Sequence, residues 1–231
     1  MELIWEGIKQ AVWLLLNGDP EVLGITWLSL RVSAVATGFS LLVGIPLGTL
    51  IALARFPGRG LVVSLVNTGM GLPPVVVGLF VSIFLWRSGP LGLLELLYTP
   101  AAIVIAQFVI AAPIVTGLTL AAVQQIPPRF RLQILALGAS RVQLLWVLLR
   151  EARLPLLAAV MAGFGGVISE VGASMMVGGN IRGQTRVLTT ATVLETGKGN
   201  FDVAIALSLL LLLITFLVNW ALTWIQQRRR V

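Results

Sequence analysis

Two ionisable side chains, Arg31 and Glu170, stand deep inside long apolar stretches of this sequence. A charge at membrane depth is costly, so each group needs a partner or a function. At about 1.5 Å of helix per residue, both lie at a similar depth below the same end of their stretches. We therefore expect Arg31 and Glu170 to form a buried ion pair that holds or gates a helical bundle. Direct contact with an anionic substrate is the alternative.

Other catalytic chemistry is scarce. The sequence contains no Cys and no His, which excludes a thiol nucleophile, an imidazole base and a soft metal site. An intramembrane hydrolase would depend on Glu170 and scattered hydroxyl groups, which is a weak basis for nucleophilic catalysis. No phosphate-binding loop of the Gly-x-x-x-x-Gly-Lys-Ser/Thr type is present. We expect a protein that is not an enzyme and holds no metal or cofactor.

The composition is that of a membrane protein. Hydrophobic residues make up 58% of the 231 residues and charged residues only 11%, against about 25% charged residues in soluble domains. Lys and Arg number 16 against 9 Asp and Glu, giving a net charge of +7. These cations lie in small clusters without interleaved aromatic residues, so we do not expect nucleic acid as a partner.

The hydropathy pattern predicts an all-α membrane protein. Residues 1–21 form an amphipathic segment too short to span a bilayer, and we expect an interfacial helix in contact with lipid. Residues 22–231 then form a transmembrane domain with five crossings. The predicted spans are residues 22–54, 61–86, 98–123, 156–178 and 203–225.

The cations between the spans predict the orientation. Most of them fall on the side that also carries the C-terminal arginines, and the positive-inside rule places that side in the cytoplasm. Five crossings then put the N-terminus outside. The cations assigned to the cytoplasmic side are Arg55, Arg59, Arg129, Arg131, Arg141, Arg150, Arg153 and Arg228 to Arg230.

Small residues and prolines interrupt the second and fourth predicted spans. Two consecutive prolines remove two backbone donors, and broken helices at membrane depth are tolerated where they line a cavity. Ordinary close packing of helices uses the same composition and is the alternative. The residues that we expect at a pore or gate are Pro73, Pro74, Val77, Gly172 and Ser174.

The polar segment 124–155 is longer than a simple connection requires. Pro127 and Pro128 end the preceding helix, and Gly138 interrupts the helical pattern that follows, where Ser140 could cap a second helix. Two short helices joined by a tight turn would form a cytoplasmic knob for another protein, whereas a plain connecting loop is the alternative. The expected contact residues are Gln133, Ala136, Gly138, Ala139, Ser140 and Arg141.

Several motifs resemble known permeases in their order and spacing. Residues 132–140, LQILALGAS, resemble the coupling motif of ABC-transporter permeases, although the acidic-Ala-Ala triplet of that motif is absent and Leu154-Pro155 lies about one turn late. GIPL at 44–47, LPPVVVG at 72–78 and GPLG at 89–92 resemble permeases of molybdate and tungstate importers. SEVGAS at 169–174, followed by MMVGGN, is more similar to the tungstate branch.

This resemblance implies an ABC-importer permease that moves a tetrahedral oxyanion, tungstate or alternatively molybdate, across the cytoplasmic membrane. It implies a homodimer, two cytoplasmic ATPase subunits that hold ATP and Mg, and an extracytoplasmic binding protein. Asn180, Arg182 and Arg186 would then contact the binding protein, and a solvated loop is the alternative. An ion-coupled secondary transporter is a further alternative, but the sequence lacks convincing half-repeats.

Overall fold

The computed structural model describes residues 2–228, and the predicted all-α fold is confirmed: within these residues the regular structure is helical. Met1 and residues 229–231, including part of the C-terminal arginine cluster used for the orientation argument, lie outside the described residues. The elements are α1 (Glu2–Asn17), α2 (Pro20–Leu53), α3 (Arg59–Met70), α4 (Pro74–Leu85), η1 (Gly92–Leu94), α5 (Pro100–Gln124), α6 (Pro128–Ala136), α7 (Arg141–Glu151), α8 (Arg153–Ile168), α9 (Gly172–Gly178), α10 (Leu188–Gly197) and α11 (Phe201–Arg228).

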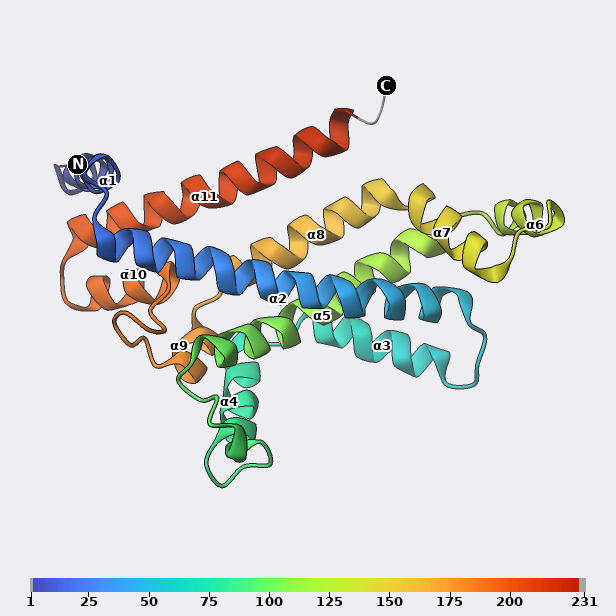
Figure 1. Cartoon of the computed structure of the whole chain (residues 1–231), viewed down its shortest axis with the longest axis horizontal. Helices are drawn as coiled ribbons and strands as arrows, with labels where there is room; N and C mark the ends of the chain where they lie inside the picture. The colour runs from blue at the N-terminus through green and yellow to red at the C-terminus, as the bar shows by residue number, and fades with distance from the viewer. Residues whose placement is uncertain (1, 229–231) are drawn as a thin grey trace.

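Helices α2 and α5 form the centre of the bundle (Figure 1). Glycines allow their backbones to approach closely, as is usual between membrane helices. A Cβ atom on Gly44 would lie 2.8 Å from Val115, and one on Gly48 would lie 2.5 Å from the carbonyl oxygen of Thr116. Helix α8 packs against both α2 and α5, and α11 contacts α8 and α10. The remaining elements are arranged around this central contact between α2 and α5.

Three helices are long and apolar enough to cross a membrane, and the number rises to five when each of two bent pairs is counted as one span. The bent pairs are α3 with α4, at 100°, and α8 with α9, at 57°. The predicted span over residues 61–86 is thus divided between α3 and α4, with the break at the two prolines that the sequence marks as an interruption. Pro73 and Pro74 lack the N–H groups that would continue α3, so α3 ends at Met70 and α4 begins at Pro74 in a new direction.

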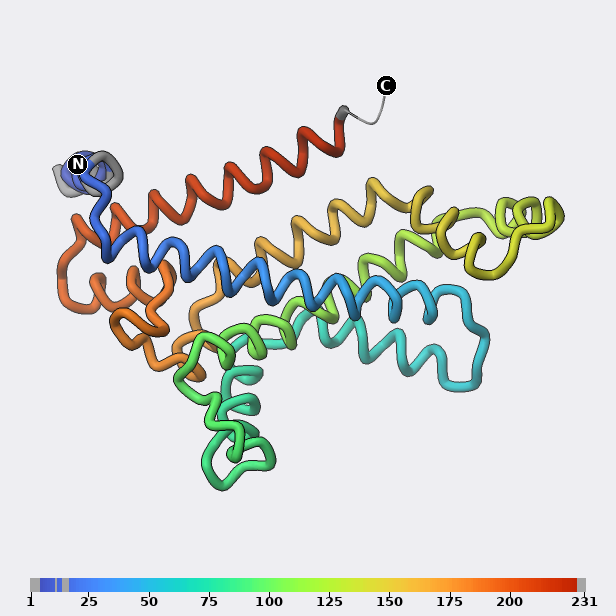
Figure 2. The backbone as a smooth tube through the Cα atoms, viewed as in Figure 1, coloured from blue at the N-terminus to red at the C-terminus, as the bar shows by residue number. Residues whose placement is uncertain are grey.

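The two ends of the bundle carry different elements. Helix α1 lies across one end, where it packs on α11, while α6 and α7 extend at the opposite end (Figure 2). Gly7 makes the α1 contact close, since a Cβ atom there would meet Ile205 at 2.4 Å. Trp5 and Trp13 on α1 are exposed. Such a position suits the interfacial role expected of residues 1–21, which stays a prediction.

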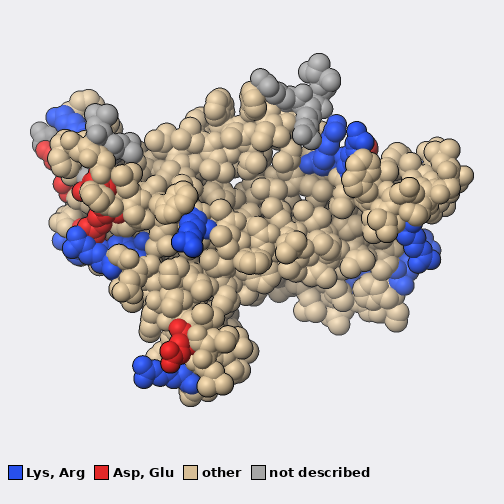
Figure 3. Space-filling view, in the orientation of Figure 1, with Lys and Arg blue, Asp and Glu red and all other residues tan. Residues whose placement is uncertain are grey.

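Charged side chains gather toward the two ends and at the tip of the arm formed by α4, with a mostly uncharged belt between them (Figure 3). The main core lies inside that belt. Its buried side chains come from α2, α4, α5 and α9, together with the segment before α10; they include Val32, Val81, Ile103, Val177 and Val187. A second cluster joins α2, α10 and α11. The uncharged belt is the part of the surface that a bilayer would cover.

Candidate functional site

The turn between α6 and α7 has the geometry that the sequence predicts. Gly138 adopts φ +84°, a left-handed conformation that favours glycine. Ser140 then caps α7: its Oγ accepts the N–H of Gln143 at 3.3 Å, and the Gln143 side chain accepts the N–H of Ser140 at 2.7 Å. This reciprocal pair satisfies two donors at the start of α7 and fixes the angle between the two helices.

The base of this element is anchored in the bundle. Ala122, Ile126, Leu148 and Ala152 form a buried cluster that joins the end of α5 to α7 and the start of α8. The Arg131 guanidinium also donates to the carbonyl oxygen of Val123 at 3.1 Å. A movement of α6 and α7 would therefore be passed directly to α5 and α8.

The outer surface of α6 and α7 is apolar and open. Leu137 is 84% exposed and Val142 75% exposed, and Leu132 and Trp146 are also exposed. Exposed apolar side chains grouped on one projecting element are typical of a protein contact. All the residues predicted to couple to a partner lie on this element: Gln133, Ala136, Gly138, Ser140 and Arg141 are exposed, and Ala139 is half-buried.

The candidate pore residues fall into two groups. Pro73 and Pro74 are exposed at the bend between α3 and α4, but Val77 is 4% exposed and Ser174 1% exposed. Val77 faces the main core, so it does not line an open path in this structure. Gly172 is half-buried, and a Cβ atom on it would lie 2.9 Å from Val75. Val77, Gly172 and Ser174 thus lie on the two helices α4 and α9 that pack together, and Pro73 and Pro74 lie at the bend where α4 begins.

The close packing of α4 on α9 depends on glycine. A Cβ atom on Gly78 would lie only 2.7 Å from the Cα atom of Ala173. The packed backbones leave no room for one helix to slide over the other at this point. Helices α4 and α9 can therefore only move together or come apart.

The predicted ion pair between Arg31 and Glu170 was wrong. Within the described part of the chain, no ion pair joins them, and Arg31 is exposed while Glu170 is 6% exposed. The Glu170 carboxylate instead accepts the N–H groups of Ala173 and Ser174, both at 2.9 Å, and the Ser174 hydroxyl at 3.1 Å. A negative charge at a helix N-terminus is favourable, so Glu170 holds the first turn of α9.

The same break is tied to two other helices, α5 and α10. Gln107 on α5 donates to the carbonyl oxygen of Val167 at 3.1 Å, just before α8 ends. The Thr189 hydroxyl on α10 donates to the carbonyl oxygen of Glu170 at 2.9 Å. The N–H of Leu188 donates to the Ser29 hydroxyl of α2 at 2.8 Å. The segment between α8 and α9 is therefore held by α5 and α10, and α10 is in turn bonded to α2.

The predicted contact residues at the opposite end are partly engaged within the chain. Arg182 donates from Nε to Glu21 at 2.9 Å and forms a second bond through Nη2, while Arg186 lies 3.4 Å from the same carboxylate. The hydrogen bond and charge of Glu21 raise the pKa of Arg182. Asn180 donates to the carbonyl oxygen of Thr190 at 3.3 Å. Arg182 keeps a largely exposed side chain.

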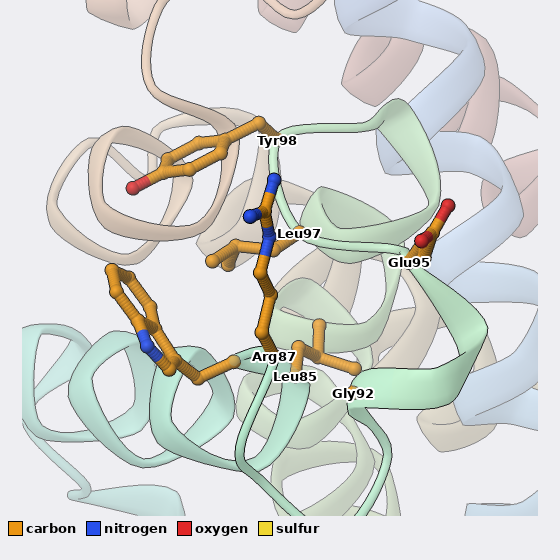
Figure 4. A pocket seen from close by; sticks show the side chains of 7 residues that line it. Leu85, Arg87, Gly92, Glu95, Leu97 and Tyr98 are labelled. Carbon is orange, nitrogen blue, oxygen red and sulfur yellow. The ribbon is translucent and has the colours of Figure 1, made fainter.

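A pocket of about 460 Å³ that the sequence analysis missed lies beside the end of α4. Figure 4 shows the Arg87 side chain extending toward Tyr98, whereas Glu95 points away. Tyr98 and Glu95 both have positive φ, and Tyr98 donates its N–H to Val177 at 2.8 Å. No motif marks such a pocket, because it arises from loop geometry. Within residues 2–228, no group of three acidic residues that could hold a metal ion is present.

Comparison with known sequences places these features in a family. The family model described as "Binding-protein-dependent transport system inner membrane component" matches residues 44–231. The tungstate uptake system permease protein TupB of Peptoclostridium acidaminophilum is 40% identical over 227 residues, which cover 98% of this chain and 100% of that protein. TupB of Campylobacter jejuni is 36% identical and covers 95% of this chain and 92% of its own length.

More distant relatives show the same architecture. The molybdenum transport system permease protein ModB of Escherichia coli is 29% identical over 225 residues, covering 91% of this chain and 97% of that protein. The fold matches a structure of the MetNI methionine ABC transporter with a TM-score of 0.74 and 24% identity, covering 94% of this chain and 96% of that one. At that identity the structural match supports the fold alone.

Proposed function

Because this chain belongs to the family of inner-membrane components of binding-protein-dependent transport systems, we propose that it is the permease subunit through which tungstate enters the cytoplasm. The observation that supports tungstate as the substrate is the 40% identity to a tungstate permease over nearly the whole chain. The lower identity to the molybdenum permease makes molybdate the less favoured substrate. The chain is a multi-pass membrane subunit without catalytic function, and ATP hydrolysis belongs to a partner.

Two copies of the chain would carry two cytoplasmic ATPase subunits, each seated on α6 and α7. Three features support this assignment: the exposed apolar surface around Leu137, the capped turn at Ser140 and the buried base around Leu148. A surface that must transmit force needs both an open contact and a rigid attachment. ATP and Mg would lie on the partner, and this chain would supply only the coupling element.

Transport would follow from the path of contacts above that element. Closure of the ATPases moves α6 and α7, and the buried cluster at their base carries the motion to α5 and α8. Helix α8 ends at the junction around Glu170, where α9 begins and packs on α4 through Gly78. In this mechanism the α4–α9 unit is the gate, and it moves as a body when α5 and α8 tilt.

The end of the bundle that carries α1 and Arg182 would face outward and receive the binding protein. The cations support this orientation, because the α2–α3 connection and the starts of α3 and α7, which carry Arg55, Arg59 and Arg141, lie at the end of the bundle that carries α6 and α7 (Figure 1). The exposed guanidinium of Arg182 could contact an acidic patch on the binding protein. The N-terminus would then lie outside and the C-terminus in the cytoplasm.

Uptake by whole cells tests the substrate assignment. A strain without its own tungstate and molybdate permeases would express this chain with its ATPase and binding protein, and cellular tungsten and molybdenum would be measured by mass spectrometry. We expect tungstate to accumulate from submicromolar medium and excess sulfate not to compete. Preferential accumulation of molybdate, with the complex intact, would contradict the assignment.

A further inference from the structure

Two neighbouring pockets share Trp27 and Arg31 of α2, and one is lined by several charged side chains whereas the other is almost wholly apolar. The first, of about 480 Å³, lies between the start of α2 and the segment before α10, and Glu21, Arg182 and Arg186 also line it. The second, of about 600 Å³, lies between α2, α8 and α11. Its lining is almost wholly apolar and includes Val35, Leu41, Phe164, Val218 and Leu222. Trp27 and Arg31 belong to both, so one elongated molecule could occupy the two pockets together.

The polar pocket has more donors than the chain satisfies. Its lining includes three arginines but a single carboxylate, Glu21, which already pairs with Arg182 and Arg186. No hydrogen bond or ion pair to Arg31 is found in the described part of the chain, and the buried Nε of Arg186 likewise has no hydrogen-bond partner there. Guanidinium groups bind phosphate through paired hydrogen bonds, so this pocket favours a phosphate-bearing anion.

The position of Arg31 in the fold indicates where such an anion would come from. Arg31 follows the start of α2 at Pro20 by about 16 Å along the helix, at 1.5 Å per residue, and its side chain is exposed on the same face as Trp27. Tryptophan and arginine on the outer turns of a membrane helix are typical of the headgroup region. The adjoining apolar pocket continues from this level toward the middle of the bundle.

We infer that these two pockets bind one anionic phospholipid, with its phosphate between Arg31 and Arg186 and an acyl chain between α2, α8 and α11. A phospholipid matches both features, whereas free tungstate or phosphate would fill only the polar pocket and leave the apolar one empty. A bound lipid would also supply a counter-charge for Arg31, which forms no ion pair within the described part of the chain. This site goes beyond the proposed transport function and does not depend on the identity of the substrate.

Lipid retention by the purified full-length chain tests the inference. The chain would be reconstituted into vesicles of phosphatidylcholine with one-fifth phosphatidylglycerol, extracted in mild detergent and examined by native mass spectrometry. The test variants are Arg31→Gln, which removes the unpaired charge, and Gly38→Leu, which fills the apolar pocket. Gly38 lines that pocket, and a Cβ atom there meets nothing within 4 Å, so a side chain at this position can extend into the pocket. The matched controls are Arg87→Gln and Gly60→Leu, which lie outside both pockets.

We expect wild-type protein and both controls to retain one phosphatidylglycerol per chain in preference to phosphatidylcholine. Arg31→Gln and Gly38→Leu should each reduce that retention about tenfold, since one charge-assisted contact or one acyl site contributes roughly that factor. Equal retention of the two lipids, or unchanged retention in both test variants, would overturn the inference. Displacement of the lipid by tungstate, or a second copy cross-linked through position 31, would overturn it as well.

Discussion

Glu170 and Ser174 lie one helical turn apart, and Ser174 donates both its N–H, at 2.9 Å, and its hydroxyl, at 3.1 Å, to a single carboxylate oxygen of Glu170. The other oxygen accepts the N–H of Ala173 at 2.9 Å. This carboxylate therefore holds the start of α9 at the point where α8 and α9 diverge by 57°. In the proposed mechanism, the same point separates the driven helix from the gate.

We predict that Glu170→Gln destabilises the permease by about 1–3 kcal/mol, because the amide nitrogen that replaces one carboxylate oxygen cannot accept and leaves the α9 donor or donors on that side unsatisfied in a buried place. Thermal unfolding in detergent measures the effect. Ser174→Ala is the comparison: it removes one of the three hydrogen bonds and should cost about half as much or less. If Glu170→Gln unfolded at the wild-type temperature, the carboxylate would have no part in holding the junction.

The turn at Gly138 offers a test of the coupling element. Valine at φ +84° is strained although the space around the position is open, whereas asparagine tolerates a left-handed conformation. We therefore expect Gly138→Val to leave the chain inserted in the membrane but to abolish copurification of the ATPase or to uncouple ATP hydrolysis from uptake. Gly138→Asn should retain both. Normal coupling in the valine variant would show that the turn geometry does not matter.

The contact between α4 and α9 should tolerate no added atom. Gly78→Ala would place a methyl group 2.7 Å from the Cα atom of Ala173, and overpacking of this kind costs about 1–3 kcal/mol. Gly165→Ala in α8 is the matched control, because a Cβ atom there meets nothing within 4 Å. Removing a helical glycine should leave that variant as stable as wild type or up to about 1 kcal/mol more stable. Equal melting temperatures for the two variants would contradict the close α4–α9 contact.

The sequence predicted local features well and three-dimensional relations poorly. The turn at Gly138 and the cap at Ser140 follow from neighbouring residues, so both are confirmed by the structure. The pairing of Arg31 with Glu170 rested on depth alone. Depth fixes the height of a residue in a bundle but not the direction in which its side chain points, and the nearby donors of α9 satisfy the carboxylate first.

The direction of the bends could not be predicted from the sequence either. Prolines at 73 and 74 indicated a disturbed helix, but the new direction of α4 depends on its packing against α9 through Gly78. Likewise, the expected contact residues Asn180, Arg182 and Arg186 give no sign of α10 just after them, whose Leu188 and Thr190 are buried. Leu188 and Ala191 there pack against α2 and α11, contacts that no local pattern reveals.

Low pH should reduce the stability of the C-terminal end of α10, where Glu195 lies. Hydrogen bonds from Asn200 and Lys198 lower the pKa of Glu195, so the charged carboxylate is favoured in the folded chain. Its contribution is then present above the ordinary Glu pKa of about 4.3 and is lost as the pH falls through the lower, folded value. Thermal unfolding between pH 7 and pH 3 should show wild type more stable than Glu195→Gln by less than about 1 kcal/mol at neutral pH. The two proteins should converge in acid. A difference that stayed constant from pH 7 to pH 3 would refute this assignment.

The central claim is ATP-driven movement of tungstate through a dimer of this chain, and reconstituted transport tests it most directly. Proteoliposomes would contain the permease with its ATPase, ATP would be enclosed on the ATPase side, and tungstate-loaded binding protein would be added on the other. We predict tungstate accumulation that requires hydrolysable ATP and the binding protein, and that is lost with Gly138→Val. Tungstate entry at the same rate without ATP, or no entry through a fully assembled complex that hydrolyses ATP, would contradict the account.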